Sequence, residues 1–308
     1  NTTGVQNVGI GVSALASNTT ATNNTAVGRH ALKTSSTSSE NTAIGSAALE
    51  LMTTGSANTA VGHRALEAST TASQNVAVGQ RALYQQTTGE KNTALGWNAG
   101  GSITAASFNT YVGQRAGDAN SNSNNTAVGS ESLSSNCGPE NTAVGSNALL
   151  ACTGARNVGV GASALVASTT GSSNVAIGAF TLDANTTGDD NVAIGYDALG
   201  ANTTADGNTA IGRNALIANT TGSNNTAVGK DALDANTTGL LNTAVGRLAL
   251  SANTTASYNV AVGEGALEAN TTGALNTAIG RGALQSNTTA NDNVAVGAWA
   301  LLANTTGT

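Results

Sequence analysis

The 308-residue chain has a formal net charge of -6, 9% charged residues, 3% aromatic residues, one Pro and 38 Gly. This composition excludes a large core of Phe, Leu and Trp, so small residues must supply most of the packing. The acidic balance and the scattered Lys and Arg exclude nucleic acid as a partner, because nucleic acid rewards clustered basic residues.

Some version of a five-residue pattern, Asn-(Val/Thr)-Ala-(Val/Ile)-Gly, returns 18 times along the chain. Copies start 17 residues apart from Asn7 to Asn109, 16 apart from there to Asn157, and 17 apart again to Asn293. Nothing is left for a second domain, so we expect one continuous repeat domain over residues 1–308, with irregular coils at about 92–157. Because the array starts and stops inside a repeat, we expect it to be a segment of a longer fibre protein.

The first half of each unit, numbered from its Asn as position 1, predicts a short strand that ends at a Gly corner. Positions 2 and 4 are β-branched except at Leu95, and side chains alternate along a strand, so we expect both positions to face inward. Position 3 is Ala in 15 units and must then face outward, where it varies too little for a surface in water. We expect it to pack against another copy of the chain, with packing within the same chain as the alternative. The candidate trimer contacts are Ala176, Ala193, Ala210, Ala227 and Ala244.

The second half of each unit reads Ala-Leu-x-Ala-Asn-Thr-Thr-Gly, as in residues 232–239. Leu at position 9 and Ala at position 11 are expected to face inward, and the variable position 10 to face water. The segments are too short for a helix, so a second strand per coil is expected. One coil cannot bury its own apolar residues, and stacked coils can. The sequence therefore predicts an all-β fold, a parallel β-solenoid of 18 coils of 16–17 residues, with an Asn ladder at position 1.

The repeated Asn-Thr-Thr run has three interpretations. Asn and Thr favour turns, because their side chains bind the local backbone. A stacked Thr array is also typical of surfaces that bind ice or a carbohydrate, and Asn-x-Thr is a glycosylation acceptor in a eukaryotic secretory pathway.

The Asn-Val-Ala-Ile-Gly motif at 174–178 and 191–195, followed after two residues by a small residue, resembles the head repeat of YadA-like trimeric autotransporter adhesins. The Asn-Thr-Ala-Val-Gly-x-x-Ala-Leu units are also similar to arrays found upstream of endosialidase-type chaperone domains in phage tail fibres and bacterial fibre proteins. The resemblance covers the whole chain and implies a left-handed β-roll assembled as a homotrimer. The 17-residue unit and its Leu-x-Ala-Asn-Thr-Thr arm depart from the adhesin heads.

The irregular middle of the array is the candidate ligand-binding region. Trp97, Phe108 and Tyr111 interrupt the pattern together with Gly100 and Gly101. Binding residues concentrate where loops depart from a rigid scaffold. The alternative is that larger side chains fill the coil where it narrows.

Two Cys and two His residues carry side chains that could react or bind a metal. Cys137 and Cys152 lie 15 apart where the coils are spaced by 16, so a disulfide and a pair of buried thiols both remain open. His30 and His63 lack ligand partners at metal-binding spacing, so no metal site and no cofactor are expected. No catalytic motif is present, and we expect no enzymatic activity.

The repeat pattern together with the resemblance implies a structural or adhesive segment of a trimeric surface or tail fibre. It is expected to be extracellular, on a bacterial surface or a phage appendage, without direct insertion into a membrane. Its outward positions 6, 7 and 10 are expected to contribute to binding a cell-surface glycan or protein receptor. The alternative is a monomeric ice- or carbohydrate-binding solenoid with a Thr/Asn face.

Overall fold

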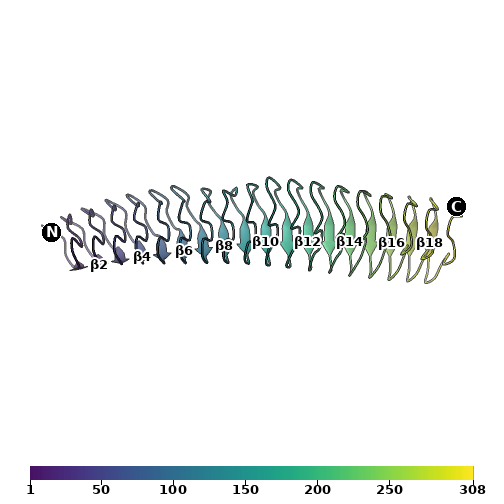
Figure 1. The fold of residues 1–308 in the computed structure, drawn as a ribbon, viewed down its shortest axis with the longest axis horizontal. Helices are drawn as coiled ribbons and strands as arrows, with labels where there is room; N and C mark the ends of the chain where they lie inside the picture. The colour runs from purple at the N-terminus through teal and green to yellow at the C-terminus, as the bar shows by residue number, and fades with distance from the viewer. Residues whose placement is uncertain (308) are drawn as a thin grey trace. The chain divides into compact units, whose positions relative to one another are not determined.

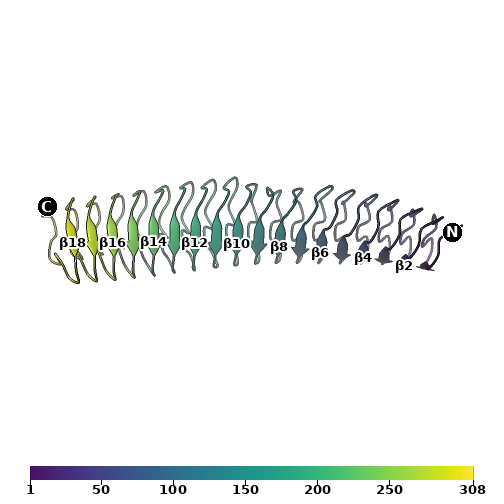
Figure 2. The same ribbon diagram turned by 180° about the vertical axis from the view of Figure 1, so that it is seen from behind.

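The computed structural model describes residues 1–307 and divides the chain into two compact units, Asn1–Thr153 and Gly154–Thr308. Each unit consists of short parallel strands joined by turns, and residues 1–307 contain no helix. Within each unit the strands follow one another in chain order, as both views show (Figures 1 and 2).

All strands are three residues long and lie at positions 2 to 4 of the repeat. The first unit contains β1 (Val8–Ile10), β2 (Thr25–Val27), β3 (Thr42–Ile44), β4 (Thr59–Val61), β5 (Val76–Val78), β6 (Thr93–Leu95), β7 (Thr110–Val112), β8 (Thr126–Val128) and β9 (Thr142–Val144). The second contains β10 (Val158–Val160), β11 (Val175–Ile177), β12 (Val192–Ile194), β13 (Thr209–Ile211), β14 (Thr226–Val228), β15 (Thr243–Val245), β16 (Val260–Val262), β17 (Thr277–Ile279) and β18 (Val294–Val296).

Within each unit, equivalent residues of successive coils lie directly above one another. β12 pairs in parallel with β13, and the register places Ala193 opposite Ala210 and Ile194 opposite Ile211. This pairing requires a complete coil between neighbouring strands, because parallel strands cannot be joined by a tight hairpin. The predicted parallel β-solenoid is confirmed for both units.

The two faces of the strand are the reverse of the sequence-based expectation. Ala193 at position 3 has 0% exposed surface, whereas Ile177 and Ile211 at position 4 are 39% and 38% exposed. At Gly9, the same position in the first coil, an added Cβ would lie 3.6 Å from Leu15 Cδ1, so position 3 points at the Leu of its own coil. The interior beside that Leu has room for a methyl group. The candidate trimer contacts are therefore wrong, because residues buried within their own chain cannot touch another; these are Ala176, Ala193, Ala210, Ala227 and Ala244.

The second half of the coil is a series of turns, so the expectation of a second strand is also wrong. Position 7 and position 9 adopt left-handed backbone conformations, with φ of 58° at Asp197 and 53° at Leu199. Such angles reverse the chain direction and are incompatible with an extended strand. Leu199 is buried as expected, but its buried neighbour is Ala198 at position 8, while Ala201 at position 11 is only half-buried.

The Asn ladder at position 1 is confirmed. The Asn174 side-chain oxygen accepts hydrogen bonds from the backbone N–H and the side-chain amide of Asn191, at 3.0 and 3.1 Å. The Asn191 amide also donates to the Ala205 carbonyl at 2.8 Å and so closes the far end of its own coil. Each buried Asn therefore ties two coils together and fixes one corner.

The Gly at position 5 is required by the close approach of two backbones. Gly195 has a φ of 133°, and a Cβ there would lie 2.7 Å from the carbonyl carbon and oxygen of Gly212. Both contacts are backbone atoms that cannot move aside without breaking the stack. Only Gly satisfies the dihedral angle and the spacing together.

A second buried ladder runs along position 12 of the second unit. Asn202 donates to the Asn185 side-chain oxygen at 3.0 Å and to the Ala205 carbonyl at 3.1 Å. The Thr203 hydroxyl donates to the Thr220 carbonyl at 3.2 Å, so the first Thr of Asn-Thr-Thr is engaged in coil stacking. This arrangement favours the turn interpretation of the run. The ladder comprises Asn185, Asn202, Asn219, Asn236, Asn253, Asn270 and Asn287.

Candidate functional site

Tyr111 is a core residue and does not belong to a binding surface. It occupies position 3, where other coils have Ala or Gly, and its exposed surface is 0%. Space for the ring comes from two Gly residues at position 9, the site of the buried Leu in other coils. A Cβ added to Gly117 would lie 2.2 Å from Tyr111 Cε1, and one added to Gly100 would lie 2.9 Å from Cδ2. One large side chain thus replaces two Leu side chains, as the alternative interpretation of this region anticipated.

Trp97 and Phe108 are exposed, and they are not brought together with Tyr111. Their exposed fractions are 45% and 55%. Trp97 lies at position 6 of its coil and Phe108 at position 17, where the Lys91 ammonium lies 4.9 Å from the ring centroid. The three predicted site residues therefore do not form one site, because the Tyr ring points into the coil.

The two cysteines are buried in neighbouring coils of the first unit and carry thiols that are not joined in a disulfide. Burial raises the pKa of the Cys137 thiol, and the hydrogen bond with Cys152 raises it further. A thiol in such surroundings stays protonated and unreactive at neutral pH.

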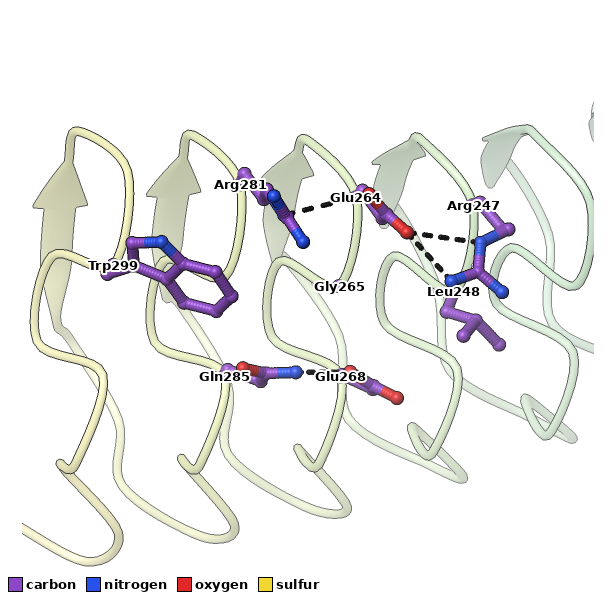
Figure 3. Close-up of a pocket in the computed structure, with 8 residues that line it drawn as sticks. All are labelled: Arg247, Leu248, Glu264, Gly265, Glu268, Arg281, Gln285 and Trp299. Carbon is purple, nitrogen blue, oxygen red and sulfur yellow. Dashed lines mark hydrogen bonds and ion pairs between the residues drawn. The ribbon is translucent and has the colours of Figure 1, made fainter.

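The outward corners at positions 6, 7 and 10 carry a different cluster near the C-terminal end of the second unit. Position 7 is Gly in two successive coils, Gly265 and Gly282, and Trp in the next, Trp299. The Trp ring covers Gly282, because a Cβ there would lie 2.2 Å from Trp299 Cε3 and Cζ3. Gly265 has no aromatic ring over it but is buried, because a Cβ there would lie 3.0 Å from Glu268 Oε2 and 3.4 Å from Gln285 Nε2. It lines a hollow of about 280 Å³, shown in Figure 3. The hollow is lined by Arg247, Leu248, Glu264, Gly265, Glu268, Arg281, Gln285 and Trp299.

Two polar rows run along the hollow, one at position 6 and one at position 10 (Figure 3). In the upper row Arg247 Nη2 lies 2.7 Å from Glu264 Oε1, and Arg281 Nε lies 3.7 Å from Glu264 Oε2. In the lower row Gln285 Nε2 donates to Glu268 Oε2 at 2.6 Å. The two Arg and two Glu side chains balance, so the lining carries no net charge.

The ion pairs of the upper row set the charge states there. The hydrogen bond from Arg247 lowers the pKa of the Glu264 carboxyl, and the charges of Arg247 and Arg281 lower it further. The same hydrogen bond raises the pKa of Arg247. Because these side chains are solvent-exposed, their pairing orients the groups and contributes little to stability.

A second hollow adjoins the first. It has a volume of about 510 Å³ and shares Glu268 and Gln285 with its neighbour. Its remaining lining is small and partly polar, consisting of Ser251, Ala252, Ala269 and Ser286. The lower polar row therefore forms a ridge between two adjacent depressions on the same face.

The His residues have no metal-binding arrangement around them. His30 Nδ1 lies 3.3 Å from Glu50 Oε1, and Lys33 shares the same oxygen. No group of three His, Cys, Asp or Glu side chains that would hold a metal ion occurs within residues 1–307. In that part of the chain there is also no helix long and apolar enough to cross a membrane.

Comparison with known proteins gave no matching family model and no matching curated protein.

The sequence did not indicate the individual residues of the polar hollow, although positions 6, 7 and 10 were expected to face outward. The available signal was the loss of a side chain at position 7 in Gly265 and Gly282, followed by Trp299 at the same position. The sequence-based prediction instead placed the ligand-binding region in the middle of the array, where Trp97, Phe108 and Tyr111 interrupt the repeat.

Proposed function

We propose that this chain is a structural and adhesive segment of an extracellular homotrimeric fibre, with no catalytic role. The resemblance to YadA-like heads and tail-fibre arrays suggests the trimer, the left-handed roll and the location on a bacterial surface or phage appendage. We place the contact between subunits at positions 2 and 4, which form the outward face of the strands, and not at position 3, which is buried.

The outward strand face is the observation that carries this proposal. Its two rows consist of Thr, Val, Ile and one Leu, and no charged residue occurs in either row of any coil. Exposed Val and Ile recur along it, as at Ile44, Val76, Ile177, Ile211 and Ile279. Sheets that face water normally carry polar side chains on that side, and extended apolar surfaces mark sites of association.

Another copy of the chain is the partner that fits this face best. The face repeats with the spacing between coils, about 4.8 Å, and a second copy presents the same repeat in register. Flat rows of β-branched side chains allow contact along many coils. Weak contact at each coil then sums to a stable assembly, and a fibre of fixed register presents several copies of each outward corner to a cell surface.

The test introduces charge on this face and measures the molar mass of the assembly. Ile177→Glu combined with Ile211→Glu is expected to dissociate the trimer, because both side chains are more than a third exposed in the isolated chain. Thr204→Glu combined with Thr221→Glu places the same charge on exposed turns of position 14 and serves as the control. Light scattering coupled to chromatography should give a trimer for the native chain and the control, and a smaller species for the Ile variant. A native monomer, or an Ile variant that stays trimeric, would contradict the proposal.

A further inference from the structure

The hollow above Gly265 combines an aromatic ring with hydrogen-bonding groups of both kinds. Trp299 lines one end, with the Arg281 guanidinium 5.1 Å from its ring centroid, while Leu248 lines the other end. Between them position 7 is Gly265, so the floor there is formed by backbone and by the Glu268 and Gln285 side-chain ends, which lie 3.0 and 3.4 Å from where a Cβ would be. The close-up shows the two polar rows on opposite sides of this floor (Figure 3).

These groups match the two kinds of surface that a sugar ring presents. The C–H face of a pyranose packs against an aromatic side chain, which supplies apolar area at little entropic cost. Its hydroxyl groups both donate and accept, and they are bound best by planar side chains with fixed geometry. Glu268 accepts, Arg281 donates, and the Gln285 amide does both.

The charge balance of the lining selects among ligands. Both Arg residues face Glu264, and Glu268 balances the second positive charge, so the lining is neutral as a whole. A phosphate or carboxylate ligand would have to displace this carboxylate, and a cation would have to compete with the two guanidinium groups. An uncharged, hydroxyl-rich ligand fits the lining without breaking an ion pair.

We propose that the hollow above Gly265 binds one ring of a neutral saccharide, which packs against the exposed part of Trp299. The ridge of Glu268 and Gln285 holds the hydroxyl groups, and the adjoining hollow receives a second sugar ring. This inference rests on the proposed adhesive function and names the class of ligand that the fibre recognises. Three equivalent sites in a trimer would raise the avidity of a weak single-site contact.

The experiment uses Trp299 as its own reporter. The chain has two Trp residues, and both are 45% exposed. In a Trp97→Phe background, emission from Trp299 is followed during titration with glucose, galactose, mannose, N-acetylglucosamine and lactose. At least one of these neutral sugars should give a saturable change, with lactose binding more tightly than galactose if galactose is the monosaccharide bound. The matched control, Trp299→Phe, leaves only Trp97 and should give no change.

Two variants test the named groups without removing the reporter. Gly265→Asn fills the floor, and Asn occupies the same left-handed position elsewhere, as at Asn214 with a φ of 58°. Glu268→Gln keeps the shape of the ridge and removes its charge. Each should weaken binding by about tenfold or more, the loss of one good contact. Circular dichroism verifies that both variants fold.

Four results overturn the inference: no saturable change with any of the neutral sugars, an equal change in the Trp299→Phe control, undiminished binding in both folded variants, or a response to sialic acid alone. The molar mass of the same sample is measured independently. A trimer without sugar binding overturns the saccharide site and leaves the fibre proposal intact. A monomer that binds sugar contradicts the fibre and supports the site.

Discussion

At the residue scale, two of the side chains that fill the interior of a coil, those at positions 3 and 9, must match each other in volume. Ala at position 3 faces Leu at position 9 in nearly every coil, and the one Tyr at position 3 coincides with the two Gly at position 9. Protein interiors are close-packed, so a gain at one position requires a loss at the other. The exchange at Tyr111 is therefore a repacking of the core, in which one ring at position 3 takes up space left by two Leu side chains.

Removing this ring should leave a cavity that its neighbours cannot fill. Tyr111→Ala is expected to lower the free energy of unfolding of the first unit by about 3–5 kcal/mol, the usual cost of deleting a buried aromatic ring. The triple variant Tyr111→Ala, Gly100→Leu, Gly117→Leu should recover most of this loss. Both Gly residues already have left-handed φ, 58° at Gly100 and 61° at Gly117, close to the 47° to 54° of the Leu residues at position 9 of other coils. The free energy of unfolding of both variants is measured by chemical denaturation.

The recovery of stability in the triple variant is the more informative result. If the triple variant is less stable than the single variant, the complementary volumes of positions 3 and 9 are not the reason for the irregular coils. Tyr111→Phe provides a further control. The hydroxyl is buried without a hydrogen-bond partner, so its removal should leave stability unchanged or raise it.

At the scale of the coil, left-handed residues at positions 7, 9 and 17 form the turns, while the Asn ladders hold the turns in place. A Leu in a left-handed conformation is unfavourable by roughly 1–2 kcal/mol. Because nearly every coil has one at position 9, each of these coils must compensate for that cost. Burial of the Leu side chain and hydrogen bonds between coils supply the compensation. Leu199 N–H, for example, donates to the Ala215 carbonyl at 3.0 Å in the next coil.

The repeat period, parallel stacking, Gly corner and Asn ladder were predictable from sequence, because each follows from a regular spacing of unusual residues. The faces of the strand were not. Positions 2, 3 and 4 are all apolar or small, and a three-residue strand has too few side chains for alternation to show which face is inside. The left-handed Leu residues were also invisible, since propensity disfavours them and only the stacked neighbours stabilise them.

The two Asn ladders should differ in their importance for stability. Asn191→Ala would leave the buried N–H of Asn208 without the acceptor it has at 2.9 Å. The Asn174 side-chain oxygen would lose the amide of residue 191 and keep only its backbone N–H. Asn202→Ala removes an amide whose acceptor, the Ala205 carbonyl, keeps its bond from Asn191. We expect losses of roughly 2–4 kcal/mol for Asn191→Ala and roughly 1–2 kcal/mol for Asn202→Ala. Thermal denaturation of the two variants, compared with Thr204→Ala on an exposed turn, checks this order.

Natural variation along the chain agrees with a larger loss of stability at position 1 than at position 12. A larger loss for Asn202→Ala than for Asn191→Ala would contradict the prediction. Position 1 is Asn in every unit, whereas position 12 of the first unit accepts other buried side chains, including Ser35, Met52, Gln86 and Ile103. The difference follows from the backbone. The position 1 oxygen receives a main-chain N–H of the next coil, and the position 12 oxygen of the second unit receives a side-chain amide.

At the scale of the whole molecule, stability is distributed over many nearly identical contacts. Each coil contacts mainly its neighbours in the stack, so the free energy of folding approximates a sum over coils and over the contacts between them. One substitution on the outward face changes one contact among many. This is why the assembly test uses two charges, and why loss of one complete coil should be tolerated.

Deletion of residues 208–224 removes one 17-residue coil of the second unit. The deletion joins Gly207, a left-handed residue at position 17, to Asn225 at position 1, which is the junction found between all regular coils. Every contact in the shortened stack then has the same type as before. We expect a folded protein whose melting temperature lies within a few degrees of the native value, measured by circular dichroism.

The matched control deletes residues 208–219, which places Thr220 where the Asn of the next coil belongs and breaks both ladders. It should lose the cooperative transition of the second unit and become sensitive to protease. Equal effects of the two deletions would show that stability depends on the identity of individual coils, and would contradict a stack of interchangeable units.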